Sequence, residues 1–325
     1  MKLFRISLLL VCVVLLSSCI SERGDRDCYG QFTLYFEYHN EENPNPVATF
    51  LQHVDYVDVF VFDQTGTLAY YRPNIDQANM QPVARRGGTR SGAPGISLPV
   101  GSGIGQLSPG GVYRVVVWGN ADRQRNSFQS EGLLNSAHIG TAPDGGTPLH
   151  FGPGSLKAEN TLPFEITIPR IDYDGSATIE FSRAHIELQV IVIGAEFVPG
   201  IEVTDVASGI DFHNELLSGR TSFQSLASTP VHIMWEGVQR PAQKTSFYTP
   251  LFNEDTDKEI VVRNGGATLV NGQISLSDAL DDHNVVLDDT NVPYMVVPIV
   301  IVVGEDAVID VVILGWERNP VGPDW

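Results

Sequence analysis

The sequence predicts an all-β protein made of antiparallel β-sandwiches. Three observations support this prediction. Apolar residues recur at every second position in many short segments, which is the pattern of a strand with one buried and one solvated face. Turns rich in glycine and proline separate these segments, and segments with a helical period are sparse. A hydrophobic fraction of 42% is ample for packed cores, so an intrinsically disordered chain is disfavoured.

The N-terminus has the pattern of a secretory signal. Two basic residues precede an apolar run over 6–16, and small residues follow it. This run is shorter than the roughly 20 apolar residues that cross a bilayer. Leu16-Ser17-Ser18-Cys19 resembles the bacterial lipobox, in which the cysteine thiol receives a diacylglycerol before cleavage. Residues 1–18 are therefore the expected lipoprotein signal peptide, and Cys19 is the expected lipidation site. A plain signal peptide or a membrane anchor is the alternative.

Charge and cysteine content limit the partners and the chemistry. The signal peptide contains Lys2 and Arg5 and no acid, so its removal leaves 18 basic and 39 acidic residues, a formal charge of −21. Phosphate binding needs clustered Lys and Arg, which disfavours nucleic acid and anionic membrane surfaces as partners. With Cys12 removed and Cys19 lipidated, Cys28 stands alone. Neither an internal disulfide nor a cysteine metal cage is then possible.

The first expected strand, Tyr29–Tyr38, has the clearest alternation, with apolar side chains on one face from Phe32 onward. The turn residues of 43–46 end it. A glycine- and arginine-rich surface loop is expected over 85–105, and a helix over 121–139. Further strands of this first series are expected at 54–62, 67–72, 112–118, 164–169 and 177–181.

A second series of strands begins with the apolar run Ile186–Ile193. The mature length of 307 residues suggests about two domains, with a boundary near residue 178. We expect a lipidated acidic linker at 19–27, an N-terminal β-sandwich at 28–178 and a C-terminal β-sandwich at 179–325. A turn is expected at 277–282, and the later strands at 201–206, 231–235, 246–251, 258–263, 272–276, 292–303 and 307–316.

Motifs of catalysis or metal binding are missing from the sequence. The eight histidines form no HExxH or HxH pair, and the Gly-x-Ser-x-Gly nucleophile turn is absent. The acidic stretches 172–175 and 255–259 have the oxygen spacing of calcium loops. Both lack the Gly at position six and the Glu at position twelve, which favours solvated turns. We therefore predict a protein that is not an enzyme and has no cofactor.

Two sequence blocks resemble a known family. The block Leu107–Asn120 (LSPGGVYRVVVWGN) and the junction Phe181–Ile186 (FSRAHI) occur together with the lipobox, the acidic spacer and the early aromatic strand. This order is similar to that of the lipoprotein subunits of Bacteroidetes type V fimbriae, in particular the FimB-type anchor branch, over essentially the whole chain. The resemblance implies two transthyretin-like β-sandwich domains, an outer-membrane, surface-exposed location and a role in assembling a pilus.

The resemblance also implies a mechanism. In such pili an Arg-specific protease removes the first strand of each shaft subunit, and a neighbour's strand fills the groove. From Asp27 to Tyr71 this chain has no Lys or Arg, so such a protease has no site between the first two strands. Cleavage at Arg23 or Arg26 would release the lipid and leave the strand in place. Retention of lipid and strand is typical of an anchor at the cell end of the fibre.

The expected function is that of a lipid-anchored fimbrial subunit that holds the fibre on the outer membrane and limits its length. Its shaft partner would bind by strand addition at the C-terminal region. The segment 307–316 is either the last strand of its own domain or a donated strand. A surface lipoprotein that binds glycan or host protein, or a tip or minor adhesin subunit, is the alternative; exposed Trp and Tyr would favour glycan binding. A secreted hydrolase would need a His–carboxylate–nucleophile cluster.

Overall fold

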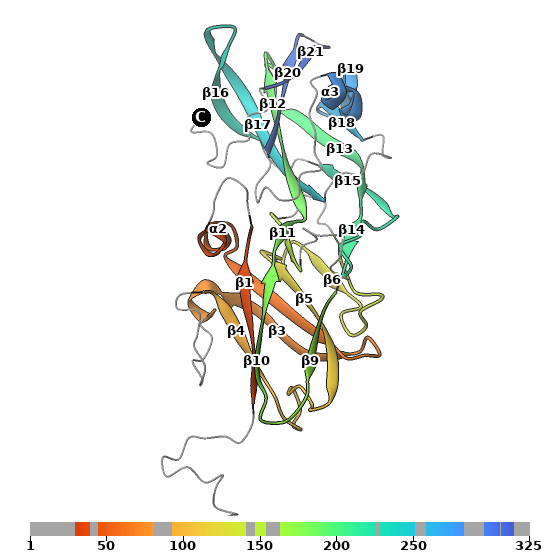
Figure 1. Cartoon of the computed structure of the whole chain (residues 1–325). Coiled ribbons are helices and arrows are strands. Elements are labelled where there is room, and N and C mark those ends of the chain that lie inside the picture. Colours follow the sequence, from red (N-terminus) through yellow and green to blue (C-terminus); the bar gives the residue numbers. More distant parts are fainter. Residues whose placement is uncertain are drawn as a thin grey trace, which may run out of the picture.

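A computed structural model describes the fold (Figure 1). The all-β prediction is confirmed, and the only α-helices among the described residues are α2 (Pro46–His53) and α3 (Leu276–Asp282). None of the described helices is both long and apolar enough to cross a bilayer. The division into two transthyretin-like domains stays a prediction. The structure describes residues 30–39, 45–80, 93–140, 147–153, 163–224, 228–250, 258–282, 296–305 and 307–314.

Apart from a short pair considered below, the nine described strands that precede residue 184 form two facing sheets. They are β1 (Gln31–Glu37), β2 (Tyr56–Phe62), β3 (Leu68–Asp76), β4 (Gly95–Pro99), β5 (Gly111–Gly119), β8 (His150–Gly152), β9 (Phe164–Ile168), β10 (Asp174–Glu180) and β11 (Ser182–Arg183). One sheet has the order β10-β1-β4, and the other has the order β11-β8-β5-β2-β3 with β9 also beside β5. Both sheets contribute side chains to one apolar core.

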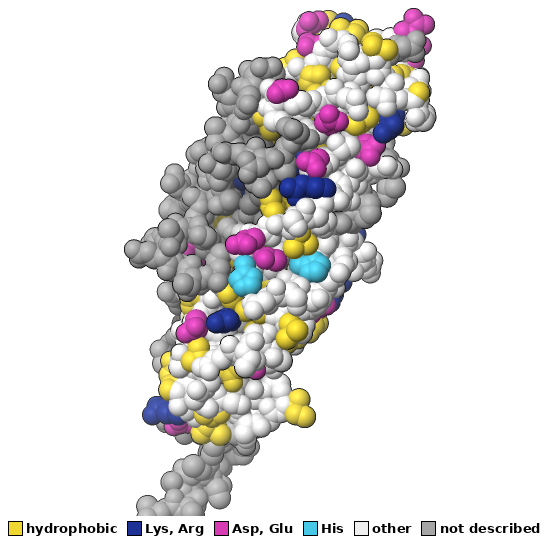
Figure 2. Space-filling model, turned by 90° about the vertical axis from the view of Figure 1, so that its right-hand side faces the viewer, with side chains coloured by type: hydrophobic (Ala, Val, Ile, Leu, Met, Phe, Trp, Pro, Cys, Tyr) yellow, Lys and Arg dark blue, Asp and Glu magenta, His cyan; other side chains and the backbone are white. Residues whose placement is uncertain are grey.

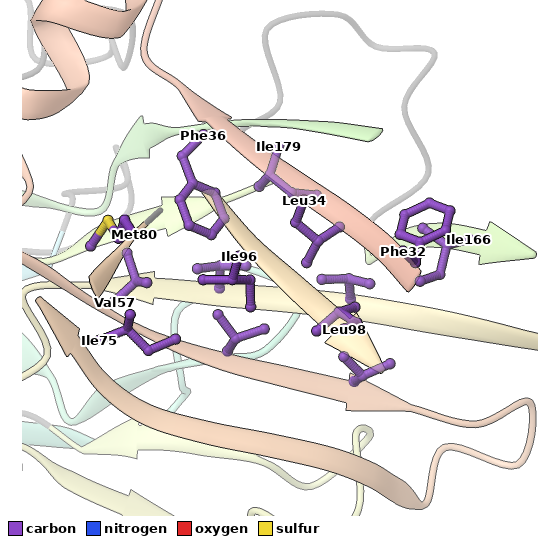
Figure 3. Close-up of a cluster of buried hydrophobic side chains, with 14 of the residues drawn as sticks. Phe32, Leu34, Phe36, Val57, Ile75, Met80, Ile96, Leu98, Ile166 and Ile179 are labelled. Atoms are coloured by element: carbon purple, nitrogen blue, oxygen red, sulfur yellow. The ribbon is translucent and has the colours of Figure 1, made fainter. Parts of the chain in front are cut away.

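The core of this half explains why the early aromatic segment is a strand. Phe32, Leu34 and Phe36 alternate along β1, and each is at most 4% exposed. In Figure 3 Leu34 and Phe36 point toward the opposite sheet, which contributes Val57 and Ile75. Phe32 lies beside Ile166 of that sheet. Each large apolar side chain buried in this way contributes about 1.5–3 kcal/mol.

The helix α2 was missed by the sequence reasoning, which treated 43–46 only as the end of a strand. Asn45 caps the helix, because its side-chain oxygen accepts a hydrogen bond from the Ala48 N–H at 3.1 Å. Pro46 occupies the first helical position, where a missing N–H has no cost. Phe50 on this helix stacks with Phe36 of β1 at 5.6 Å between ring centroids. The helix therefore covers the end of β1.

Two sequence predictions in this half are wrong. Residues 121–139 form turns and two short strands, β6 (Ser127–Gln129) and β7 (His138–Gly140), instead of a helix. Arg123 lies over the Tyr71 ring of β3 at 5.1 Å and forms an ion pair with Asp58 of β2 at 3.5 Å, so side-chain contacts hold this segment on the sheet. The predicted surface loop over 85–105 contains β4, which pairs with β1. Its neighbours 81–92 lie outside the described residues.

Strands that follow residue 184 form a second pair of sheets with its own apolar core. They are β12 (His185–Ile193), β13 (Pro199–Ala207), β15 (Arg220–Gln224), β16 (Thr229–Trp235), β17 (Val238–Pro250), β18 (Glu259–Asn264), β19 (Ala267–Ser275), β20 (Val296–Val303) and β21 (Val308–Ile313). The sheet orders are β16-β17-β12-β20-β21 and β15-β13-β18-β19. The expected turn at 277–282 is part of α3.

Parallel pairing occurs once in each half. β1 lies parallel to β10, and β12 lies parallel to β20, whereas the other pairs between described strands are antiparallel. In both halves the first strand is thus placed next to a strand far along the sequence. A long-range pair of this kind has no local sequence signal, since only the alternation within each strand is visible in the sequence.

Gly95 shows how tightly β4 approaches β1. A Cβ at this position would lie 2.3 Å from the carbonyl oxygen of Leu34. Gly95→Ala is therefore expected to destabilise the protein by about 1–3 kcal/mol, because β4 would have to shift away from β1. Gly132→Ala is the matched control, since nothing lies within 4 Å of its added Cβ. Urea unfolding of both variants is the measurement, and equal midpoints would contradict the expected clash.

Candidate functional site

The predicted lipidation site lies outside the described residues, as do Cys28 and the linker 19–27. Lipidation of Cys19 therefore stays a prediction. The described part of the functional region begins with Gly30 and β1, which connect this linker to the folded protein. Three features bear on assembly: the environment of β1, the junction between the two halves of the chain, and the edge strand β21.

β1 is the central strand of its sheet. It pairs along seven residues with β10, from Gln31–Asp174 to Glu37–Glu180, and along five residues with β4. Hydrogen bonds beyond the strand extend this contact, since the Phe181 N–H donates to the Glu37 carbonyl at 2.8 Å. The first strand thus has partners on both edges within its own chain. Its removal would leave an open groove between β10 and β4.

The two sequence blocks singled out above meet on either side of β8. Within the first block, the end of β5 pairs with one edge of this strand, with Trp118 opposite Phe151. The second block contains β11, which pairs with the other edge and places Arg183 opposite His150. The chain then passes directly into β12 and the second half. Both blocks therefore build the junction between the halves.

A buried polar cluster lies at this junction. Tyr38, His150, Arg183 and His185 are each at most 2% exposed. The Tyr38 hydroxyl lies 3.4 Å from Nδ1 of His150, and the two imidazole rings stand edge to face at 5.3 Å. Nδ1 of His185 lies 2.7 Å from the carbonyl oxygen of Leu149, so this nitrogen carries the proton and donates.

Burial determines the protonation of this cluster. It lowers the pKa of His185 to about 3, even though the hydrogen bond to Leu149 acts in the opposite direction. Burial also lowers the pKa of His150 well below its usual value, and the charge of Arg183 adds to this effect. Both imidazoles are therefore neutral at physiological pH. Burial raises the pKa of Tyr38, which stays protonated.

A short strand from the second half pairs with the first half. β14 (Gly209–Asp211) lies antiparallel to β7, with Ile210 opposite Ile139. Phe212 follows β14, donates its N–H to the Ala137 carbonyl at 3.1 Å and is fully buried. Its ring lies in an aromatic cluster of the first half, with ring centroids at 4.8 Å from Phe60, 6.0 Å from Phe62, 6.0 Å from Trp118 and 6.5 Å from Phe128.

Sequence reasoning did not single out Phe212. The residues Gly209–Phe212 are too few to give a reliable alternation, and their partner β7 lies in a segment predicted to be helical. The contact therefore became visible only in the tertiary structure.

β21 is an edge strand at the other end of the molecule (Figure 1). It pairs antiparallel with β20, from Ile299–Ile313 to Val303–Val308. Among the described residues no strand pairs along its second edge, although β19 and α3 lie close to β21 and the preceding Ala307 makes a bridge to Val270. The segment 307–316 was predicted to be either a last strand of its own sheet or a donated strand. The described part of it is the last strand of its own sheet.

The acidic stretches do not form a cation site in the described chain. Asp172 forms an ion pair with Arg170 at 3.1 Å, and Asp174 accepts a hydrogen bond from the Gln31 N–H. The stretch 255–259 lies partly outside the described residues. In the described ranges no group of three or more His, Cys, Asp or Glu side chains could hold a metal ion.

Aromatic side chains of the described chain form no exposed platform. Trp118 is fully buried, Trp235 is half-buried, and Trp316 and Trp325 lie outside the described residues. Each described tyrosine is buried or half-buried. Exposed Trp and Tyr, which would favour the glycan-binding alternative, are therefore missing from the described surface.

Comparison with known proteins decides the family. A family model described as "Fimbrillin-A associated anchor proteins Mfa1 and Mfa2" matches residues 25–318. The chain belongs to this Mfa2 family. The sequence-based resemblance to fimbrial anchor proteins is thereby confirmed. Membership supports a role as a fimbrial subunit associated with cell-surface fimbriae. No curated protein sequence matches the chain.

Solved structures agree with the Mfa2 fold. The fimbrial anchor protein Mfa2 from Porphyromonas gingivalis is 14% identical, with a TM-score of 0.54 over 89% of this chain and 98% of that one. A candidate adhesin from Bacteroides thetaiotaomicron is 16% identical, with a TM-score of 0.59 over 90% and 98%. A candidate polysaccharide-binding protein from the same organism is 14% identical, with a TM-score of 0.58 over 88% and 96%. At these identities the likeness concerns the fold.

Proposed function

We propose that this member of the Mfa2 family is a lipid-anchored fimbrial subunit that holds the fibre on the outer membrane and limits its length. Cys19 carries the lipid, and β1 stays joined to it after maturation. The protein performs no chemistry in this role. Its task is to transmit tension from the lipid to the fibre.

The central position of β1 carries the proposal. This strand has partners on both edges, and its apolar face belongs to the core. The segment between β1 and β2 contains no Lys or Arg. The first Lys or Arg after β1 is Arg72, which lies in β3. An Arg-specific protease therefore cannot separate β1 from the rest of the domain. A subunit that keeps its first strand has no open groove and cannot accept a donated strand there.

Tension applied at Cys19 would load β1 in shear along two strand edges. The ladder to β10 and the ladder to β4 would have to break together before the strand leaves. From the first half the load passes to the second half through β11, which leads into β12, and through the paired strands β7 and β14. This geometry suits a protein that remains attached to a long fibre.

We also propose that the shaft subunit adds a strand at the free edge of β21. The Leu314 N–H donates to the Pro298 carbonyl at 3.0 Å, so Leu314 faces β20. Because direction alternates in an antiparallel ladder, the Val312 N–H also faces β20 and the Val311 N–H faces the free edge. At this edge the Val311 N–H donates a hydrogen bond to the carboxylate of Asp310 at 2.9 Å. A carbonyl of an incoming strand would take the place of this carboxylate.

The proposed anchor function predicts the state of the mature N-terminus. Protein isolated from the cell surface is expected to begin with acylated Cys19 and to retain β1, as mass spectrometry of the N-terminal peptide can establish. Cys19→Ala is expected to abolish outer-membrane retention, and deletion of the protein is expected to produce long, poorly attached fibres. Unchanged fibre length and attachment after deletion would refute the anchor role.

Val311→Pro tests the free edge of β21. Proline removes the outward N–H but none of the hydrogen bonds to β20. It also removes a valine side chain that packs against the core, so the subunit is expected to fold with a loss of about 1–3 kcal/mol. Pull-down of the shaft protein is expected to fall at least tenfold, since strand addition depends on main-chain hydrogen bonds. Val311→Thr keeps both the N–H and the branched shape and is the matched control. Full recovery of the shaft protein with a folded Val311→Pro subunit would exclude this edge.

A further inference from the structure

Three segments meet at the end of the first half from which the chain leads back to Cys19. Gly30 donates its N–H to the Ile171 carbonyl at 2.5 Å, and its carbonyl accepts the Val100 N–H at 3.1 Å. The loop 101–106 after β4 and the loop 169–173 before β10 therefore border the start of β1. This end is the lower tip in Figure 1, opposite to β19 and β21.

An isoleucine is fully exposed on the first of these loops. Ile104 has an exposed fraction of 108%, the highest among the large hydrophobic residues of the described chain. The loop is closed by hydrogen bonds, since Gly101 donates to Leu107 at 3.0 Å and Gln106 donates to Gly103 at 3.2 Å. Ile104 is thus presented by a defined turn. Ile171, on the neighbouring loop, is 40% exposed.

Charge is sparse at this end of an otherwise acidic protein. Residues 91–113 contain no Asp, Glu, Lys or Arg, although the whole chain has 39 acidic and 20 basic residues. On the neighbouring loop the charges of Arg170 and Asp172 are paired, and the exposed Asp174 accepts a hydrogen bond from the Gln31 N–H. Figure 2 shows hydrophobic side chains exposed at the lower end, and most of the visible carboxylates lie above it. An acidic protein pays the smallest electrostatic cost when it contacts lipid headgroups through an uncharged surface.

We infer that this end of the protein rests on the bilayer that carries the acyl chains, with Ile104 inserted among the headgroups. The inference rests on the proposed lipidation of Cys19. The chain between Cys19 and Gly30 spans at most about 38 Å when fully extended, so the lipid keeps this end close to the membrane. Apolar side chains of peripheral proteins reach about 5–10 Å into the headgroup region.

The contact would orient the molecule more than it would attach it. Acyl chains supply the attachment, because each buried methylene contributes about 0.8 kcal/mol and Ile104 is a single side chain. With the lower tip on the membrane, the opposite end with β21 points away from the cell surface. That orientation presents the proposed shaft contact to the growing fibre.

The test places a tryptophan at the tip. The acylated full-length protein with Ile104→Trp is reconstituted in phosphatidylcholine vesicles, and quenching of tryptophan emission by brominated phosphatidylcholine is measured after subtraction of the unsubstituted protein. Val270→Trp is the matched control, because Val270 is 63% exposed on β19 at the opposite end. We expect at least twofold stronger quenching and blue-shifted emission for Ile104→Trp.

Other outcomes overturn the inference in distinguishable ways. Equal quenching of the two variants in an acylated protein contradicts the membrane contact and leaves the proposed function intact. An emission shift of Ile104→Trp that requires high protein concentration and no vesicles would assign this surface to a second copy of the chain. An N-terminal peptide without acyl chains contradicts both the proposed lipidation and the membrane contact.

Discussion

Phe212→Ala is expected to destabilise the protein by about 3–5 kcal/mol, the usual range for removing a fully buried phenylalanine ring. The ring belongs to the second half of the chain, yet it is buried among Phe60, Trp118 and other aromatic residues of the first half. Its removal would leave a cavity that the rigid sheets cannot refill. The substitution is therefore expected to weaken mainly the contact between the two halves.

The location of the effect can be measured by hydrogen exchange. In Phe212→Ala the amides of β7 and β14 are expected to exchange faster, and unfolding is expected to separate into two transitions. Phe223→Ala is the matched control, because Phe223 is equally buried but lies in the core of the second half. Unchanged protection of β7 in Phe212→Ala would show that the halves are held together elsewhere.

Acidification from pH 7 to pH 5 is expected to cost about 2 kcal/mol of unfolding free energy through His185 alone. The pKa of His185 is lowered to about 3 in the folded protein by burial, whereas an unfolded histidine titrates near 6.5. Below about pH 6.5 His185 therefore binds a proton in the unfolded chain but not in the folded protein. The free energy of unfolding is highest above that pH, and it declines as the pH falls toward 3 because protonation of His185 favours the unfolded chain. His150 acts in the same direction.

The contribution of His185 can be isolated by comparing pH profiles. His185→Phe removes the hydrogen bond to Leu149 and is expected to lower the free energy of unfolding at pH 7. The decrease in this free energy between pH 7 and pH 5 is expected to be smaller by about 2 kcal/mol than in the unsubstituted protein. His232→Phe is the matched control, because His232 is exposed on β16. Urea unfolding at pH 5, 6 and 7 supplies the profiles. A profile of His185→Phe that runs parallel to the unsubstituted one would mean that this imidazole is not buried in its neutral form.

The two effects concern the same part of the molecule. Phe212 and His185 both lie at the junction of the halves, and the proposed anchor transmits tension through it. A weakened junction would let the second half separate from the first while both β1 and the lipid stay in place. Because the chain runs unbroken from β11 into β12, the expected cellular result of Phe212→Ala is a junction that opens under load while the two halves stay covalently joined.

Local sequence patterns predicted much of the fold because their information is local. Alternation identified β1, β2, β5 and β12, since each has one or two apolar faces along a continuous run. The helix α2 was predictable in principle from Asn45 and Pro46 but was not recognised. The predicted helix over 121–139 failed because contacts with distant residues, such as Arg123 over the Tyr71 ring of β3, override a weak local preference.

The features proposed to act in fibre assembly were also only partly predictable from the sequence. The unbroken stretch without Lys or Arg from Asp27 to Tyr71 could be read directly, because a protease recognises side chains in the sequence. The partners of β1 could not, since β10 and β4 are separated from it by long stretches of chain. Which edge of β21 is free also depended on a sheet order that no local pattern encodes.

By itself, the sequence determined the all-β class, the resemblance to fimbrial anchors and the expectation that lipid and first strand remain joined. Each of these rests on periodicity, composition or a short motif. Only the tertiary structure decided that β1 is central, that the two sequence blocks meet at β8, and that Phe212 joins the halves. Those contacts pair residues far apart in the chain, where burial and hydrogen-bond geometry select the partner and leave no local signal.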